Sequence, residues 1–157
     1  MKLWRLTRAP FVALDGEGAL RNGARYAPDG VPVVSLASEA ALAVLIALRY
    51  QPKFMRGDLV GIPDDFVLGW TEVDAVPERV PDQNGEAAIR AYVGDWLASR
   101  RSLLAAVSSR VLPEADVVLL NPAHPAASQV PPLTCRPFSF AECLHTPPML
   151  AQFQGRS

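Results

Sequence analysis

The chain has 157 residues, with 15 Lys+Arg against 16 Asp+Glu and a formal net charge of −1. This length suits one domain that buries roughly two thirds of its unfolded surface, so we expect a single domain over residues 1–157. The balanced charge argues against direct nucleic-acid binding, and no apolar run has the length of a membrane span or a secretory leader.

The first 30 residues predict a strand followed by a glycine-rich loop. Apolar and polar residues alternate over 2–7, which is typical of a strand. The loop over 8–30 is dense in glycines, which allow close backbone approach, and a short strand is expected at 24–26 within it. Arg21 and Arg25 in this loop have the fork geometry that binds phosphate or carboxylate. A solvated hairpin with two surface arginines is the alternative interpretation.

The next segment predicts a buried strand and a buried helix. The run 31–37 is apolar and rich in β-branched residues, which indicates a strand. Ser38 is expected to cap a helix that begins at Glu39 and reaches Tyr50. Apolar residues fill almost every position of this helix, so we expect it to be buried on most sides.

Prolines break the remainder into short elements. Strands are expected at 58–62, 66–70, 103–107, 117–120 and 135–140, and a helix at 86–100. Tyr92 and Trp96 on this helix have the spacing of core residues. Cys135 and Cys143 lack CxxC spacing, so a disulfide is unsupported and a reducing, cytoplasmic setting is expected.

The two histidines, His124 and His145, have no Cys or carboxylate at ligand spacing, so no metal site is expected. His124 is better explained as a turn cap. Ser108 and Ser109 with His124 lack a third orienting group and a nucleophile-elbow pattern, which argues against a Ser–His hydrolase.

The order of several short motifs resembles one known family, the RES domain. The motifs are LWRL at 3–6, GEGALRNGARY at 16–26, DGVPVV at 29–34, LAVL at 42–45, GDWL at 94–97, VSS at 107–109, LLNPAHP at 119–125 and PFSF at 137–140. The resemblance covers most of the chain. It implies an α/β fold similar to ADP-ribosyltransferases, in which a central mixed or antiparallel sheet is flanked by helices.

The resemblance also implies a function. Characterised members are toxins of toxin–antitoxin pairs that degrade NAD by splitting nicotinamide from ADP-ribose, and an Xre-type antitoxin neutralises them. It therefore implies NAD as substrate, no cofactor and an antitoxin partner, with a homodimer left open. By position in the motifs, Arg25 and Ser109 are the expected catalytic residues, and Arg5, Arg25, Tyr26 and Ser35 are expected to bind NAD. Arginine forks suit the two phosphates of a dinucleotide.

Two positions depart from the family pattern. Ser35 occupies the position of the family's tyrosine, and Ile46 occupies that of its glutamate. Cleavage of a nicotinamide riboside builds positive charge on the ribose, which a carboxylate stabilises and an isoleucine cannot. The resemblance to the family favours an enzyme that cleaves NAD. The absence of the family's tyrosine and glutamate favours a catalytically inactive module that binds a nucleotide or an antitoxin-like protein.

Three other carboxylates are candidate substitutes for the family's glutamate. Glu17 in the glycine loop is near Arg21 and Arg25 in sequence, although an ion pair with an arginine explains it better. Glu39 is about 10 Å from Ile46 along a helix axis. Glu114 is expected in a solvent-facing turn. None restores the motif convincingly.

Overall fold

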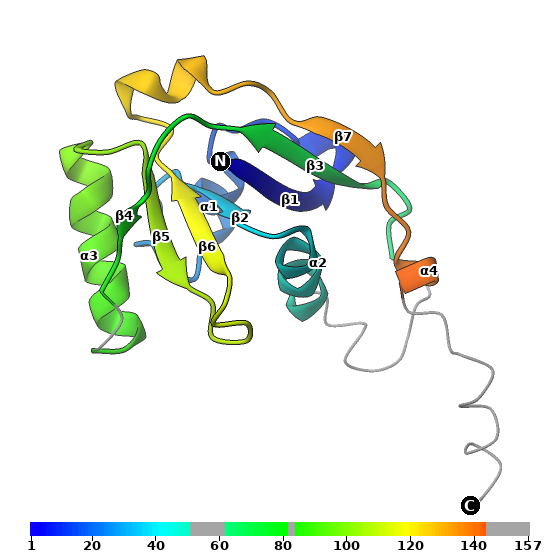
Figure 1. The fold of residues 1–157 in the computed structure, drawn as a ribbon, viewed down its shortest axis with the longest axis horizontal. Helices are drawn as coiled ribbons and strands as arrows, with labels where there is room; N and C mark the ends of the chain where they lie inside the picture. Colours follow the sequence, from blue (N-terminus) through cyan, green and yellow to red (C-terminus); the bar gives the residue numbers. More distant parts are fainter. Residues whose placement is uncertain (51–61, 82–83, 144–157) are drawn as a thin grey trace, which may run out of the picture.

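The computed structural model describes residues 1–50, 62–81 and 84–143, and within them seven strands form one sheet (Figure 1). The strand order is β4-β5-β6-β2-β1-β3-β7. Along the chain the elements are β1 (Lys2–Arg8), η1 (Ala9–Phe11), α1 (Glu17–Asn22), β2 (Val34–Ala37), α2 (Ala40–Arg49), β3 (Phe66–Glu72), β4 (Glu78–Arg79), α3 (Glu86–Ser99), β5 (Leu104–Ser108), β6 (Asp116–Leu120), η3 (Pro125–Gln129), β7 (Thr134–Pro137) and α4 (Phe140–Cys143). Only the β4–β5 pair is parallel among these strands, so the expected mixed sheet flanked by helices is confirmed.

Two apolar clusters cover the two faces of the sheet. Strand β6 contributes to both, because its side chains alternate: Val117 and Leu119 belong to one cluster, and Val118 and Leu120 to the other. The first cluster also contains the buried residues of α2 and α3, and alanines of η3 pack against the second. Helices α2 and α3 therefore lie on one face and η3 on the other.

The sheet opens between β1 and β2. These strands share a single residue pair, Trp4 with Ala37, whereas β1 pairs with β3 at seven positions. Figure 1 shows α2 beside this junction, where the two halves of the sheet diverge. The pairing of β1 with β2 therefore ends at Trp4, one residue before Arg5.

The glycine-rich segment differs most from the sequence-based expectation. Helix α1 forms inside it, where the Asp15 carboxylate accepts a hydrogen bond from the Glu17 amide at 3.0 Å. The short strand expected at 24–26 was wrong, because only an isolated bridge joins Ala24 and Ala27. The following strand begins at Val34, three residues later than expected.

The cap of α2 was also assigned to the wrong residue. Glu39 is the N-cap, without a side-chain capping bond. The Ser38 hydroxyl instead accepts a hydrogen bond from the Asp116 amide at 2.9 Å, which ties the end of β2 to the start of β6. A tertiary contact has therefore taken the place of the local cap.

Most later elements match their expected positions. Helix α3 and the strands β3, β5 and β6 each begin within one residue of the expected position. The last strand, β7, ends at Pro137, before the expected end at 140, and α4 follows it. The expected strand at 58–62 lies almost wholly outside the described residues. Trp96 is fully buried and Tyr92 packs against the same cluster, as predicted for core residues.

His124 does cap a turn, since its Nδ1 accepts from the Ala126 amide at 3.1 Å. Cys135 and Cys143 are both free and exposed. In the described part of the chain, no helix has the length and apolar character needed to cross a membrane.

Candidate functional site

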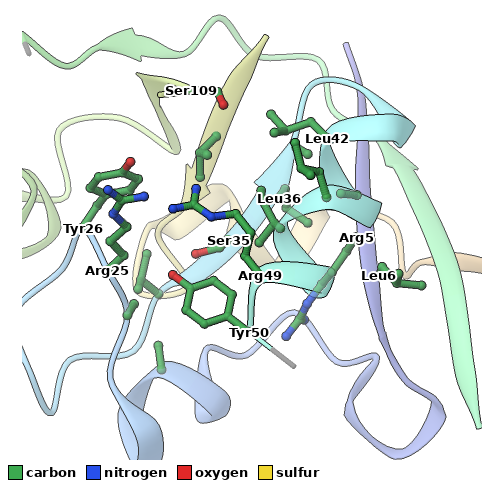
Figure 2. Close-up of a pocket in the computed structure, with 18 of the residues that line it drawn as sticks. Arg5, Leu6, Arg25, Tyr26, Ser35, Leu36, Leu42, Arg49, Tyr50 and Ser109 are labelled. Atoms are coloured by element: carbon green, nitrogen blue, oxygen red, sulfur yellow. The ribbon is translucent and has the colours of Figure 1, made fainter. Parts of the chain in front are cut away.

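A pocket of about 610 Å³ lies at the junction of β1, β2, α2 and the segment that follows α1 (Figure 2). This volume is typical of ligand-binding pockets. All six residues singled out from the sequence line it: Arg5, Arg25, Tyr26, Ser35, Ile46 and Ser109. They come from separate parts of the chain, and the fold brings them to one cavity.

Arg5 enters the pocket where β1 and β2 separate. It lies one residue beyond the single β1–β2 pair, and its Nη1 donates to the carbonyl oxygen of Ala13 at 3.1 Å. Burial lowers the pKa of Arg5 from its ordinary value, and the nearby Asp15 carboxylate partly opposes this effect. An arginine stays protonated despite such a shift, so Arg5 provides a partly desolvated positive charge.

Arg25 is held by helix α3. Its Nε donates to Glu86 Oε2 at 3.0 Å, and this hydrogen bond raises the pKa of the guanidinium. Its backbone is fixed by Arg90, whose Nη1 donates to the carbonyl oxygens of Ala24 and Arg25 at 2.9 and 2.8 Å. The loop that presents Arg25 is therefore anchored to a regular helix, without being part of a strand itself.

Tyr26 lines the pocket from beneath Arg25. It is 5 % exposed and belongs to the first core cluster, and the Arg25 guanidinium carbon lies 5.1 Å from its ring centroid. Such a cation–π contact helps to orient the guanidinium. Most of the surface of the Tyr26 ring is therefore in contact with other protein side chains.

Ser35 and Ile46 lie on facing elements of the pocket wall. Ser35 is exposed on β2, between Val34 and Leu36, which are buried in the second cluster. Ile46 is half-buried on α2 and packs against the first cluster. The pocket wall thus presents a short polar side chain at Ser35 and an apolar side chain at Ile46.

Ser109 lies just beyond β5 and is 6 % exposed. Its Oγ accepts hydrogen bonds from the amides of Val111 and Leu112 at 3.3 and 3.2 Å. Both contacts use the oxygen as acceptor, so the hydroxyl proton is left to donate. Ser109 therefore stabilises a turn and keeps one donor for a ligand.

The described lining is strongly cationic. It contains four arginines, Arg5, Arg25, Arg49 and Arg110, against one carboxylate, Asp29. Asp29 is itself paired with Arg90 at 3.3 Å. Positive charge focused in a concave site attracts anions, and several guanidinium forks suit phosphate oxygens.

None of the three alternative carboxylates lines this pocket. Glu17 pairs with Arg21 at 3.2 Å, as expected for an arginine partner. Glu39 and Glu114 are exposed. No group of three or more His, Cys, Asp or Glu is placed to hold a metal in the described residues.

Sequence reasoning did not single out Arg49, Tyr50 and Arg110, which also line the pocket. The first two had a detectable signal, because they follow Ile46 at spacings of three and four and so share its helix face. Arg110 had none, since its position depends on the β5–β6 turn.

The model of the RES domain family matches residues 2–141. This chain belongs to the RES domain family. The RES protein is 33% identical over 130 residues to the Prs ADP-ribosylating toxin of Sphingobium sp. strain YBL2, which covers 74% of this chain and 77% of the relative. It is 30% identical over 135 residues to Toxin Res of Pseudomonas putida strain KT2440, which covers 81% and 88%.

A solved structure confirms the fold assignment. The RES protein superposes on a chain of the M. tuberculosis MbcT–MbcA toxin–antitoxin complex with a TM-score of 0.64, over 88% of this chain and 84% of that chain. The identity is 17%, so this similarity concerns the fold alone. The RES protein is thus a toxin-family member by sequence and shares the architecture of a solved toxin–antitoxin protein.

Proposed function

We propose that the RES protein binds NAD in the arginine-lined pocket and acts on the bond between nicotinamide and ribose. The observation that carries this proposal is the convergence of Arg5, Arg25 and Ser109 on one cavity of about 610 Å³. A pyrophosphate suits guanidinium forks, and one relative is named an ADP-ribosylating toxin.

In this proposal the residues have distinct roles. Arg5 and Arg25 bind the pyrophosphate, and the Ser109 hydroxyl donates to the nicotinamide amide or to a ribose hydroxyl. The C–N bond breaks with its electron pair leaving on nicotinamide. A nucleophile then adds to the ribose carbon and loses a proton; water, phosphate and a protein side chain are the three acceptors to compare.

Turnover is expected to be slow because of Ile46. A carboxylate at this place would stabilise the positive charge that develops on the ribose, an effect worth ~10²–10³ in rate. Asp29, which pairs with Arg90, is the sole carboxylate in the described lining. The RES protein therefore retains the binding groups and lacks a group for the chemical step.

Binding without turnover is the second candidate function, and Ile46 is the observation that favours it. Such a protein would hold a nucleotide, or the segment of a partner that imitates one. An Xre-type antitoxin is the partner proposed for either function, since one solved structure of this fold is a toxin–antitoxin complex. An acidic segment would complement the four arginines.

One experiment separates the two. Purified protein is mixed with NAD, nicotinamide release is followed by chromatography, and ADP-ribose binding is measured by calorimetry. Release that Arg25→Ala abolishes supports the enzyme. Binding without release supports the binding module. A folded protein that neither binds ADP-ribose nor releases nicotinamide refutes both nucleotide proposals.

A further inference from the structure

Two side chains at the C-terminal end of α2 line the pocket, and neither belongs to the motifs shared with the family. Arg49 is the last residue of the helix and Tyr50 is its C-cap, and both line the cavity. They follow Ile46 by three and four residues, so they continue the helix face that already contributes Leu42 and Ala43 to the lining. The pocket wall therefore extends one turn past the position of the missing glutamate.

The two side chains face Arg25 across the cavity. In Figure 2 the Arg49 side chain extends over Ser35 toward Arg25, and the hydroxyl end of Tyr50 is directed to the same region. Tyr50 lines the same cavity as Arg25 and Arg49. Arg25, Arg49 and Tyr50 therefore surround a common space.

Arg49 forms no ion pair with any residue that the structure describes. Arg25 has a partner in Glu86, but Glu86 is on α3 and outside the lining. Two guanidinium groups directed at the same space repel each other unless an anion lies between them. A bridging pyrophosphate would satisfy both.

The Tyr50 ring is available to a ligand. It is 63% exposed although it borders a cavity, and it makes no ring contact with another described aromatic residue. Tyr26, the other tyrosine of the lining, is 5% exposed. Trp4 also lines the pocket, but it is only half-buried and its ring packs against Trp70 at a centroid distance of 5.6 Å. Because Ser35 is too short to stack with a base, Tyr50 is the most exposed aromatic ring that the described lining offers to a heterocycle.

We propose that Arg49 and Tyr50 form a nucleotide-recognition subsite, in which Arg49 and Arg25 hold the pyrophosphate and the Tyr50 ring stacks on a base of the dinucleotide. The subsite rests on the proposed NAD pocket and extends it by naming residues that take over aromatic recognition at a site where Ser35 has no ring. It assigns a binding role to the end of α2, whatever the rate of turnover.

The test is calorimetry on the full chain with two probes, ADP-ribose and a carbocyclic NAD analogue that resists cleavage. Tyr50→Ala is expected to raise Kd about tenfold or more, which is the usual effect of losing a stacked base. Tyr50→Phe keeps the ring and is expected to stay within about twofold of wild type. Weakening for the NAD analogue alone would identify nicotinamide as the stacked base, and weakening for both probes would identify adenine.

Arg49→Ala is expected to weaken both probes about tenfold and to flatten the salt dependence, because one charge-assisted contact is lost. Two substitutions outside the pocket serve as matched controls. Phe11→Ala removes a ring that is 55% exposed, and Arg136→Ala removes an exposed guanidinium on β7. Neither is expected to alter Kd. Thermal melts verify that all variants are folded, which is expected since Tyr50 and Arg49 are exposed.

The outcomes separate this inference from the proposed function. If wild type binds ADP-ribose and Arg5→Ala abolishes binding, but Tyr50→Ala and Arg49→Ala bind like wild type, the NAD pocket stands and the subsite is refuted. If Tyr50→Phe is as weak as Tyr50→Ala, stacking is refuted. If folded wild type binds neither probe, the proposed function fails and the subsite fails with it.

Discussion

Glu86 Oε2 accepts a hydrogen bond from Nε of Arg25 at 3.0 Å, which connects the pocket to the first residue of α3. Arg90, one turn later, donates to the carbonyls of Ala24 and Arg25. Gly94, one further turn along, lies so close to Pro28 that an added Cβ would come within 2.9 Å of the proline ring. One face of α3 therefore fixes the whole segment that presents Arg25.

Glu86 and a ligand phosphate would compete for the same guanidinium. Glu86→Gln is expected to improve ADP-ribose affinity about two- to fivefold, since a partly exposed ion pair contributes about 0.2–1 kcal/mol. Calorimetry measures the change. Glu114→Gln, which removes an exposed carboxylate outside the pocket, is the control and is expected to have no effect. A lower affinity for Glu86→Gln would show that Glu86 orients Arg25 more than it neutralises it.

Ile46→Glu places a carboxylate in the pocket wall, at the position that we assign to the family's glutamate. Nicotinamide release is expected to rise about 10²-fold, because the carboxylate stabilises positive charge on the ribose. Ile46→Gln has a similar shape without the charge and is expected to leave the rate unchanged. Equal rates for the Glu and Gln variants, with both folded and binding ADP-ribose, would mean that the chemical step lacks more than this one group.

Gly16 and Gly18 provide a matched pair for stability. Gly16 has φ +75°, and an added Cβ would lie 2.6 Å from the Val33 amide nitrogen, so Gly16→Ala is expected to cost about 2 kcal/mol or more. Gly18 is inside α1 with open space around it, so Gly18→Ala is expected to be neutral or to stabilise by about 0.5–1 kcal/mol. Urea unfolding of both variants measures the difference in free energy of unfolding. Equal stability of the two variants would contradict a backbone at Gly16 that requires glycine.

Glu78 is expected to make stability depend on acid pH. Hydrogen bonds from Arg101, Tyr92 and Ser102 hold its pKa below the usual 4.5. The stabilisation is therefore complete above that value and is lost as the pH falls through the lower pKa of the folded state. Glu78→Gln is expected to be less stable than wild type at pH 7 and to lose less stability between roughly pH 5 and 3.

Chemical unfolding across this pH range provides the measurement. Glu72→Gln, at an exposed position at the end of β3, is the control. Parallel pH curves for wild type and Glu78→Gln would rule out Glu78 as the source of acid sensitivity.

Local patterns predicted the elements with strong periodicity. The alternation at the N-terminus, the apolar run before α2 and the spacing around Trp96 each led to the right type of element. The predictions at Ser38 and at 24–26 were wrong because a tertiary partner decided both. Ser38 bonds to the Asp116 amide, and Arg90 binds the carbonyls that a strand at 24–26 would have used in a ladder.

By itself, the sequence determined the family, the α/β class and the six residues to look for, because short motifs and periodicity are properties of neighbouring residues. Only the tertiary structure decided that β1 and β2 part after a single pair, that all six residues face one cavity, and that Arg49 and Tyr50 join them. The physical reason is that a pocket exists where packing leaves a gap, and that gap depends on strand twist and helix placement across distant parts of the chain.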